Sequence, residues 1–298
     1  MSRNKGKIKI LEQKRLLFPQ ILKKRSEDIH KKALAKVLVV AGSKGMTGAA
    51  VLTCKAALRA GAGMVCLAFP KSLKEIYKDL LIEALTLPCP ATKQGTLSKR
   101  ALKSILEKSK EYDVVAIGPG LSQNPETQLL IRSLLPKLEK PVILDADGIN
   151  AIKDTRVLRQ RKIPTIITPH PGEMARLLGI RVEAVQKDRE HIAVGAAKKF
   201  RSIVVLKGYN TVIASKQGNV VVNKTGGPAL ATAGTGDVLL GIMSVLWAEN
   251  LAYPFESAAT AVHLHGLAGD LAAKELGERA EIASDVIKYL PKAFKIAG

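Results

Sequence analysis

Aromatic residues and long apolar runs are scarce in this chain of 298 residues. Phe, Trp and Tyr together make up 4% of the sequence, so few rings are available on which nucleic-acid bases could stack. No apolar run approaches the roughly 20 residues that span a bilayer. The N-terminus lacks the apolar core of a secretory signal. We therefore expect a cytoplasmic protein with no membrane partner.

Cysteine is also rare. The three cysteines, Cys54, Cys66 and Cys89, have neither the spacing of a metal site nor that of a redox pair. Cys54 stands in a helical pattern and Cys66 in an apolar run, as small core residues do. Their odd number agrees with a reducing compartment.

Acidic residues are outnumbered, which gives the chain a formal net charge of +21. Residues 1–36 alone contain twelve Lys and Arg against three acids. A basic arm of this kind can bind nucleic acid or an anionic membrane. Because aromatic residues are so few, we favour a solvated extension over residues 1–30, followed by one domain over residues 31–298. Nucleic acid is then an unlikely partner.

From Lys36 onward, short apolar runs alternate with helical patterns. Continuous apolar runs are typical of strands that are buried on both faces of a parallel sheet. They fall at residues 37–40, 64–68, 113–117, 141–144, 165–167 and 203–206. Residues 211–214 and 219–222 then read as a hairpin, and helices are expected at 237–249, 256–276 and 284–294. The pattern predicts an α/β fold with a doubly wound, mostly parallel sheet, helices on both faces and a late β-hairpin.

The sequence also predicts the structure of three further segments between these strands. One short helix is predicted over residues 149–159 and one longer helix over residues 182–200. Residues 84–96, which contain Pro88 and Pro90, are predicted to form an extended or loop segment.

The unusual motifs all follow a predicted strand. In doubly wound sheets, ligands bind at the carboxyl ends of the strands, so these segments should meet at one edge. They are residues 42–48, 118–120, 145–150, 168–173, 207–211 and 226–237. This shared position predicts a binding site more strongly than any single motif does.

The glycine-rich stretch over residues 226–237 ends in Thr235-Gly236-Asp237, where a helix pattern begins. Free backbone N–H groups and the positive end of the helix dipole make such a place an anion site. A carboxylate beside a phosphate is tolerable if it takes a proton from an attacking hydroxyl. Asp237 is therefore either a general base or a helix cap, and this stretch leaves both open.

Each of the other polar residues at this edge has two possible roles. Asp145 and Asp147, two apart in an extended segment, point the same way and either hold Mg²⁺ through water or cap the next helix. Lys207 either approaches a phosphate or reaches water. His170, held between two prolines, is either structural or a ligand residue. The spacing at 42–48 does not fit a dinucleotide fingerprint.

Seven motifs, taken in order, carry a resemblance to a known family over about residues 30–290. They are Gly-Ser-Lys-Gly-Met-Thr-Gly at 42–48, Gly-Pro-Gly-Leu at 118–121, Asp-Ala-Asp at 145–147, Thr-Pro-His-Pro-Gly-Glu at 168–173, Leu-Lys-Gly at 206–208, Ala-Thr-Ala-Gly-Thr-Gly-Asp at 231–237 and His-Leu-His-Gly at 263–266. Together they resemble the ADP/ATP-dependent NAD(P)H-hydrate dehydratases, which have a ribokinase-like fold. Ala233 departs from the pattern, because glycine is common at that position.

The resemblance implies roles for single residues. Asp237 matches the catalytic aspartate, which also contacts the hydrated nicotinamide. The NAD(P)HX site would include Ala49, Gly120, His170 and Asp237. The adenine-nucleotide site would include Lys207, Gly208, Tyr209, Asn210, Thr211, Gly234, Thr235 and Gly236. No residue is assigned to a metal directly.

The implied reaction is the dehydration of the S epimer of hydrated NADH or NADPH (NADHX or NADPHX) through a phosphorylated hydrate. ADP or ATP would be the co-substrate and Mg²⁺ the cofactor. The string that starts at His170 resembles the bacterial branch, which favours ADP. The resemblance further implies a homo-oligomer, a tetramer, and an NAD(P)HX epimerase on a separate chain. The alternative function is a ribokinase-like kinase that phosphorylates a small vitamin-type alcohol.

Overall fold

One sheet organises residues 9–11, 21–22 and 34–298, which the computed structural model describes. Its strands among these residues are β1 (Lys9–Ile10), β2 (Lys36–Val40), β3 (Met64–Pro70), β4 (Leu85–Cys89), β5 (Val114–Ile117), β6 (Val142–Leu144), β7 (Thr165–Ile167), β8 (Ile203–Leu206), β9 (Val212–Ala214) and β10 (Asn219–Val222). Their order across the sheet is β1-β10-β9-β8-β7-β6-β5-β2-β3-β4.

Parallel pairing dominates this sheet. Only β9 runs antiparallel to its two neighbours, β8 and β10, so the late hairpin is the exception to the parallel pattern. After β1, which lies at one end of the sheet, the chain enters the middle of the sheet at β2. It then extends to β4 on one side and from β5 to β10 on the other. The predicted doubly wound, mostly parallel α/β fold with a late hairpin is therefore confirmed.

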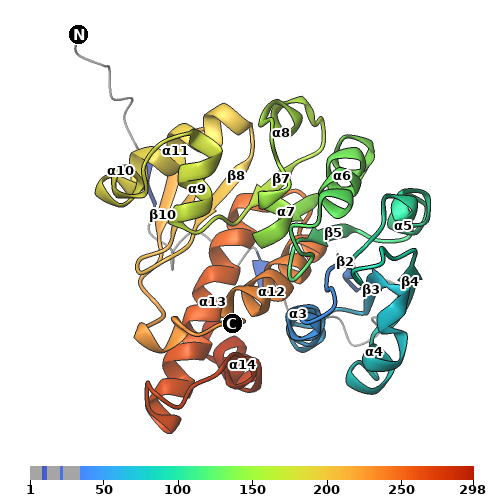
Figure 1. Cartoon of the computed structure of the whole chain (residues 1–298). Helices are drawn as coiled ribbons and strands as arrows, with labels where there is room; N and C mark the ends of the chain where they lie inside the picture. The colour runs from blue at the N-terminus through green and yellow to red at the C-terminus, as the bar shows by residue number, and fades with distance from the viewer. Residues whose placement is uncertain (1–8, 12–20, 23–33) are drawn as a thin grey trace.

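Helices cover both faces of the sheet. They are α3 (Thr47–Arg59), α4 (Lys74–Leu80), α5 (Leu102–Ser109), α6 (Pro125–Leu134), α7 (Ala146–Asn150), α8 (Arg156–Gln160), α9 (Pro171–Leu178), α10 (Val182–Lys187), α11 (Arg189–Phe200), α12 (Thr235–Glu249), α13 (Pro254–Leu276) and α14 (Ala283–Ala297). Figure 1 shows α3, α12, α13 and α14 on one side of the sheet and α6, α8, α9 and α11 on the other.

Strand β2 shows why the apolar runs are continuous. Val37 and Val39 belong to the core beneath α3 and α12, whereas Leu38 and Val40 belong to the core on the opposite face. Because successive side chains of a strand point to opposite faces, a strand covered on both sides needs an apolar residue at every position.

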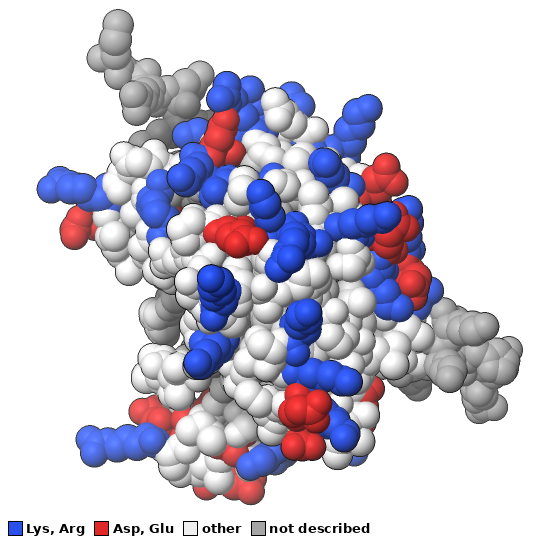
Figure 2. Space-filling model, turned by 45° about the vertical axis from the view of Figure 1, so that its right-hand side comes forward, with Lys and Arg blue, Asp and Glu red and all other residues white. Residues whose placement is uncertain are grey.

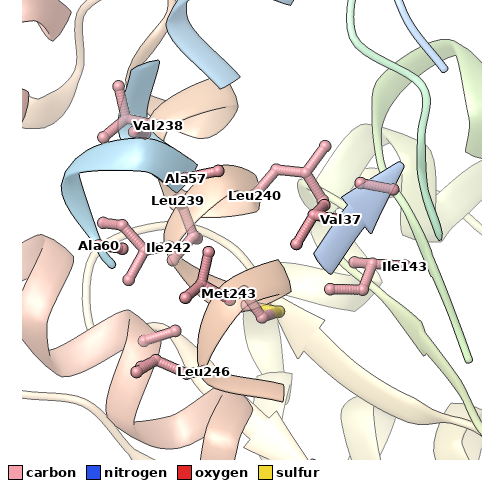
Figure 3. Close-up of a cluster of buried hydrophobic side chains, with 14 of the residues drawn as sticks. Val37, Ala57, Ala60, Ile143, Val238, Leu239, Leu240, Ile242, Met243 and Leu246 are labelled. Atoms are coloured by element: carbon pink, nitrogen blue, oxygen red, sulfur yellow. The ribbon is translucent and has the colours of Figure 1, made fainter. Parts of the chain in front are cut away.

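Close packing of α12 against α3 positions the start of α12. Figure 3 shows Leu239, Ile242 and Met243 of α12 with Ala57 of α3 in this core. A Cβ atom on Gly241 would lie 2.4 Å from the carbonyl oxygen of Thr53, so only glycine lets the two helices approach this closely.

Two predicted helices are broken in the structure. The helix expected over 149–159 is replaced by α7 and α8, because Asp154 accepts a hydrogen bond from the Arg156 N–H at 2.9 Å and starts a new helix. The helix expected over 182–200 is divided at Asp188, which ends α10 and caps α11. An Asp inside a helical pattern can restart a helix, and the periodicity alone did not reveal this.

The expected extended segment at 84–96 contains β4. Pro88 lies within this strand and lacks an N–H donor, which only an edge strand tolerates. β4 stands at the end of the sheet, in agreement with this rule.

The described residues of the basic extension contact the domain. Lys9–Ile10 pair with β10, and the Leu11 N–H donates to the Val220 carbonyl at 2.9 Å. Ile21 is only 3% exposed, and the Asn250 side chain donates to its carbonyl at 3.3 Å. Most of the extension lies outside the described residues, so its predicted boundary at residue 30 stays a prediction.

Positive charge is spread over the surface. On the face shown in Figure 2, Lys and Arg side chains are scattered over several elements with Asp and Glu among them. None of the helices in the described ranges combines the length and the apolar character that crossing a membrane requires.

Candidate active site

The first turn of α12 forms the centre of the site. Gly234 precedes the helix with φ of +93°, a left-handed conformation that favours glycine, and no side chain caps the helix there. The Thr235 hydroxyl lies 2.9 Å from the carbonyl oxygens of both Leu230 and Thr232, which folds the glycine-rich loop back on itself. The helix end thus keeps free N–H groups for an anion.

Asp237 is the third residue of α12. Its carboxylate accepts no hydrogen bond from any residue that the structure describes, so the helix-cap alternative has no geometric support. Burial raises the pKa of Asp237 to about 7, the negative charge of Asp145 adds to this, and Lys207 opposes it. A carboxylate with a pKa near neutrality is a competent general base under ordinary conditions.

A buried ion pair lies beside Asp237. The Lys207 ammonium donates to Oδ1 of Asp145, and the Thr168 hydroxyl donates to the same oxygen at 2.7 Å. Burial alone would lower the pKa of Lys207, but the carboxylates of Asp145 and Glu173 raise it above its usual value. The Lys207 ammonium is therefore charged, and it lies 3.6 Å from the position that a Cβ of Gly236 would occupy.

Asp145 and Asp147 do not point the same way, which corrects the sequence expectation. Ala146 has φ of +44° and α7 begins there, so the segment is not extended. Asp145 turns inward to Lys207. Asp147 instead accepts hydrogen bonds from the Ser122 N–H at 2.9 Å and from the Asn150 side chain at 3.0 Å.

A close backbone approach fixes the position of Asp145. Gly118 has φ of +145°, and a Cβ atom there would lie 1.8 Å from the carbonyl oxygen of Asp145. The glycine motif at 118–120 therefore lets β5 and β6 end side by side, and this brings the Asp145 carboxylate to the site.

A cavity of about 850 Å³ opens beside the first turn of α12. Of the eight residues predicted on the nucleotide side, six line it: Lys207, Gly208, Tyr209, Thr211, Thr235 and Gly236. Asn210 and Gly234 belong to the same two loops but do not line the cavity. The structure thus brings together two segments that are distant in the sequence.

Arg189 supports one of these loops, and the sequence reasoning missed it. Its guanidinium donates to the carbonyl oxygens of Leu206 at 2.9 Å and of Lys207 at 3.1 Å, and also to that of Tyr209. A half-buried arginine that binds carbonyl groups has no local sequence signal, because its acceptors lie 17 to 20 residues away.

Helix α13 supports the other loop. Asp270 accepts a hydrogen bond from the Gly226 N–H at 2.9 Å. His265 lines the cavity, and its Nε2 is buried without a hydrogen-bond partner among the described residues. Burial lowers the pKa of His265 to about 4, so the ring is neutral at neutral pH.

Besides Asp237, three residues are predicted on the hydrate side, and the structure places them in two groups. Gly120 is next to Ala49, because a Cβ on Gly120 would lie 3.3 Å from that of Ala49. His170 lines the cavity and also caps α9, where its Nδ1 accepts from the Gly172 N–H at 3.0 Å. The structural role expected for His170 is therefore confirmed, and its contact with a ligand stays a prediction.

The site fits a metal ion that arrives with a phosphate rather than a metal cage made by the protein. No group of three or more His, Cys, Asp or Glu side chains within 9–11, 21–22 and 34–298 could hold an ion. Asp145 and Asp237 nevertheless place two carboxylates beside the anion loop. Mg²⁺ is usually held by one or two carboxylates together with substrate phosphates and water.

Comparison with known proteins gives an independent view of this arrangement. The sequence profile of the NAD(P)H-hydrate dehydratases matches residues 37–292. A bifunctional NAD(P)H-hydrate repair enzyme of Moorella thermoacetica is 46% identical over 271 residues, which cover 91% of this chain and 51% of that protein. An ADP-dependent (S)-NAD(P)H-hydrate dehydratase of Neisseria meningitidis is 36% identical over 266 residues, which cover 88% of this chain and 85% of that protein.

A solved structure agrees with these relatives. The ADP/ATP-dependent NAD(P)H-hydrate dehydratase of Bacillus subtilis, co-crystallised with ATP and Mg²⁺, matches 98% of this chain and 99% of its own, with a TM-score of 0.80 and 30% identity. The chain spans about half the length of the bifunctional relatives. Since the family profile extends from β2 into α14, the chain belongs to the NAD(P)H-hydrate dehydratase family.

Proposed function

We propose that this chain catalyses the ADP- or ATP-dependent dehydration of the S epimer of NADHX and NADPHX, which returns NADH and NADPH. It is then a carbon–oxygen lyase that repairs damaged cofactor. The dehydratase activities of the relatives from Neisseria and Bacillus support this proposal. The observation that carries it is the position of Asp237, a carboxylate with a pKa near 7 in the first turn of α12, next to Lys207.

Asp237 is the general base in this proposal. It takes the proton from the hydroxyl that hydration added to the nicotinamide ring, and the freed oxygen attacks the terminal phosphoryl group of the nucleotide. The bond between that phosphoryl group and the rest of the nucleotide breaks. The phosphorylated hydrate then loses phosphate and a ring proton. Phosphate is a far better leaving group than hydroxide, which explains why a nucleotide is needed.

The remaining residues bind and orient the two substrates. The N–H groups that follow Gly234 and the Lys207 ammonium would hold the phosphates, because both carry positive charge. The other nucleotide contacts would come from the loop that Arg189 supports. Mg²⁺ would neutralise phosphate charge between Asp145 and Asp237. Ala49, Gly120 and His170 would contact the hydrated nicotinamide.

A single assay tests this function. The S epimer of NADHX is mixed with the protein, Mg²⁺ and either ADP or ATP, and the absorbance of restored NADH is followed together with free phosphate. We expect NADH and phosphate to appear in equal amounts, and faster with ADP than with ATP. A phosphoester that accumulates from a vitamin-type alcohol, without NADH release, would support the kinase alternative instead.

The proposal extends to partners and location. The relatives called bifunctional are matched over about half their length, so an NAD(P)HX epimerase is the expected functional partner. We propose that the dehydratase is a cytoplasmic homo-oligomer and that the oligomer is a tetramer. Light scattering of the purified protein tests the oligomer, and a mass of a single chain would contradict it.

A further inference from the structure

A second cavity lies at the amino ends of the strands, whereas Asp237 lies at their carboxyl ends. Its volume is about 720 Å³, in the range of small-molecule sites. It is lined by the starts of β7 and β8, the turn between β9 and β10, and the start of α13. Thr165 lines this cavity while Thr168 contacts Asp145, so the two sites lie roughly 10 Å apart along the strand direction.

Positive charge dominates the lining of this second cavity. Five of its lining residues are cationic, and Glu256 is the one acid among them. The cations are Arg159, Arg161, Lys162, Arg201 and Lys216. None of these five forms an ion pair within 4.0 Å with a residue of the described ranges, although the Asp154 carboxylate lies near enough to Arg159 to interact with its charge. The uncapped N-terminus of the 23-residue helix α13 adds its positive dipole end.

Arg201 stands in a conformation that ordinarily selects glycine. It ends α11 with φ of 53° and ψ of 33°, the left-handed region. Helix α9 ends in the same conformation with Gly179, the usual residue for this position. A residue with a side chain is strained in this conformation, because its Cβ lies too close to the following carbonyl oxygen. The Arg201 side chain thus occupies a strained position and faces the cavity.

Arg161 places a fixed charge in the wall. Its guanidinium donates to the Leu138 carbonyl at 3.1 Å, the Lys140 carbonyl at 2.8 Å and the Thr165 hydroxyl at 3.0 Å. Burial lowers the pKa of Arg161 to about 10, so it remains protonated at neutral pH. All of these acceptors are neutral. The wall therefore carries a full positive charge without a counter-ion.

We propose that this second cavity binds a small ligand that carries two or more phosphate groups. Several cations at the rim and one in the wall suit a ligand with several negative charges. The neutral side chains of Gln160, Gln217 and Asn219 supply hydrogen bonds around it. A single-stranded nucleic acid fits less well, because Phe255 is the one aromatic ring in the lining and is 6% exposed.

Calorimetry with inorganic tripolyphosphate tests this site in metal-free buffer at about 0.15 M salt, where exposed charges are screened beyond roughly 8 Å. The wild-type chain is compared with the double variant Arg201→Gly and Lys216→Gln. Glycine keeps the left-handed helix end, so this variant should remain folded. The matched control is Lys74→Gln with Lys78→Gln, which removes the same charge from exposed positions on α4 at the other end of the sheet.

We expect saturable binding by the wild type, at least a tenfold loss of affinity in the cavity variant and less than a threefold loss in the control. Hydrogen exchange locates the ligand, with protection expected at residues 159–165 and 215–219. Equal losses in both variants, or protection confined to residues 226–237, would overturn the proposal. Binding of an RNA oligonucleotide with the same sensitivity, and none of tripolyphosphate, would assign this surface to nucleic acid and also overturn it.

Discussion

Lys207 and Asp145, 62 residues apart in the chain, form an ion pair beside the first turn of α12. The pair lies next to Asp237, whose pKa it influences in both directions, since Asp145 raises it and Lys207 lowers it. Three charged groups from the ends of β6 and β8 and the start of α12 therefore act on one another at the site.

Replacing Asp237 with Asn should nearly abolish turnover while nucleotide binding holds or rises. Loss of a general base reduces the rate about a hundred- to ten-thousand-fold, and removing the negative charge eases repulsion of phosphate. The carboxylate has no hydrogen-bond partner in the described part of the chain, so the variant should fold. Turnover is measured by NADH absorbance and ADP binding by calorimetry on one preparation. Near-normal turnover would eliminate Asp237 as the base.

Activity and stability should depend on pH in opposite directions because of Asp237. The base acts when deprotonated, so kcat/KM should rise with pH through about 7 and then level off. In the folded state the Asp237 carboxyl group stays protonated up to about pH 7, whereas in the unfolded chain it loses its proton near pH 3.8. The folded state thus binds more protons between these values, and this group's contribution to stability falls as pH rises.

The stability gap between the Asp237→Asn variant and the wild type should therefore be smallest below pH 3.8 and widen in favour of the variant up to about pH 7. Denaturant unfolding of both proteins across this pH range measures the gap. A gap that is constant with pH would show that Asp237 titrates normally.

Replacing Asp145 with Asn should destabilise the fold by roughly 1–3 kcal/mol, because it leaves the Lys207 ammonium without its carboxylate. The companion change Lys207→Met should restore part of this loss, since an uncharged pair leaves no buried charge. Unfolding in denaturant is measured for both single variants and the double variant. Strict additivity of the three values would mean that the ion pair does not couple the two residues.

His170 can be tested apart from its capping role. His170→Ala removes the α9 cap and should cost about 0.5–2 kcal/mol, whereas Asn is itself a good cap and should preserve stability. We expect His170→Asn to weaken apparent affinity for NADHX and to leave that for ADP unchanged. If ADP affinity falls and NADHX affinity does not, His170 belongs to the nucleotide side.

A chain that begins at residue 31 should keep nearly full turnover, because none of the predicted ligand residues lies before it. Its melting temperature should fall, since burial of an isoleucine side chain such as Ile21 contributes about 1.5–3 kcal/mol. A chain that lacks only residues 1–8 is the control and should melt like the whole chain. Loss of turnover in a folded truncated protein would place the extension in the site.

The sequence alone was enough to predict the sheet and the edge at which the site lies. Its apolar runs show which strands are buried on both faces, and its glycine motifs follow those strands. Both signals are local, because they depend on neighbours within a few residues. The glycine loop that runs into a helix pattern likewise marked Asp237 as either a general base or a helix cap, and the family resemblance favoured the base.

Only the tertiary structure decided how the charged residues act. Asp145 pairs with Lys207 instead of acting with Asp147. Arg189 supports the site from a helix without any motif. His265 belongs to the motif at 263–266, but only the packing of α13 brings it to the cavity. The pKa of Asp237 likewise depends on burial and on the charges of Asp145 and Lys207, which follow other strands. Local sequence sets which segments become strands and helices, but the distances between charges depend on how distant segments pack.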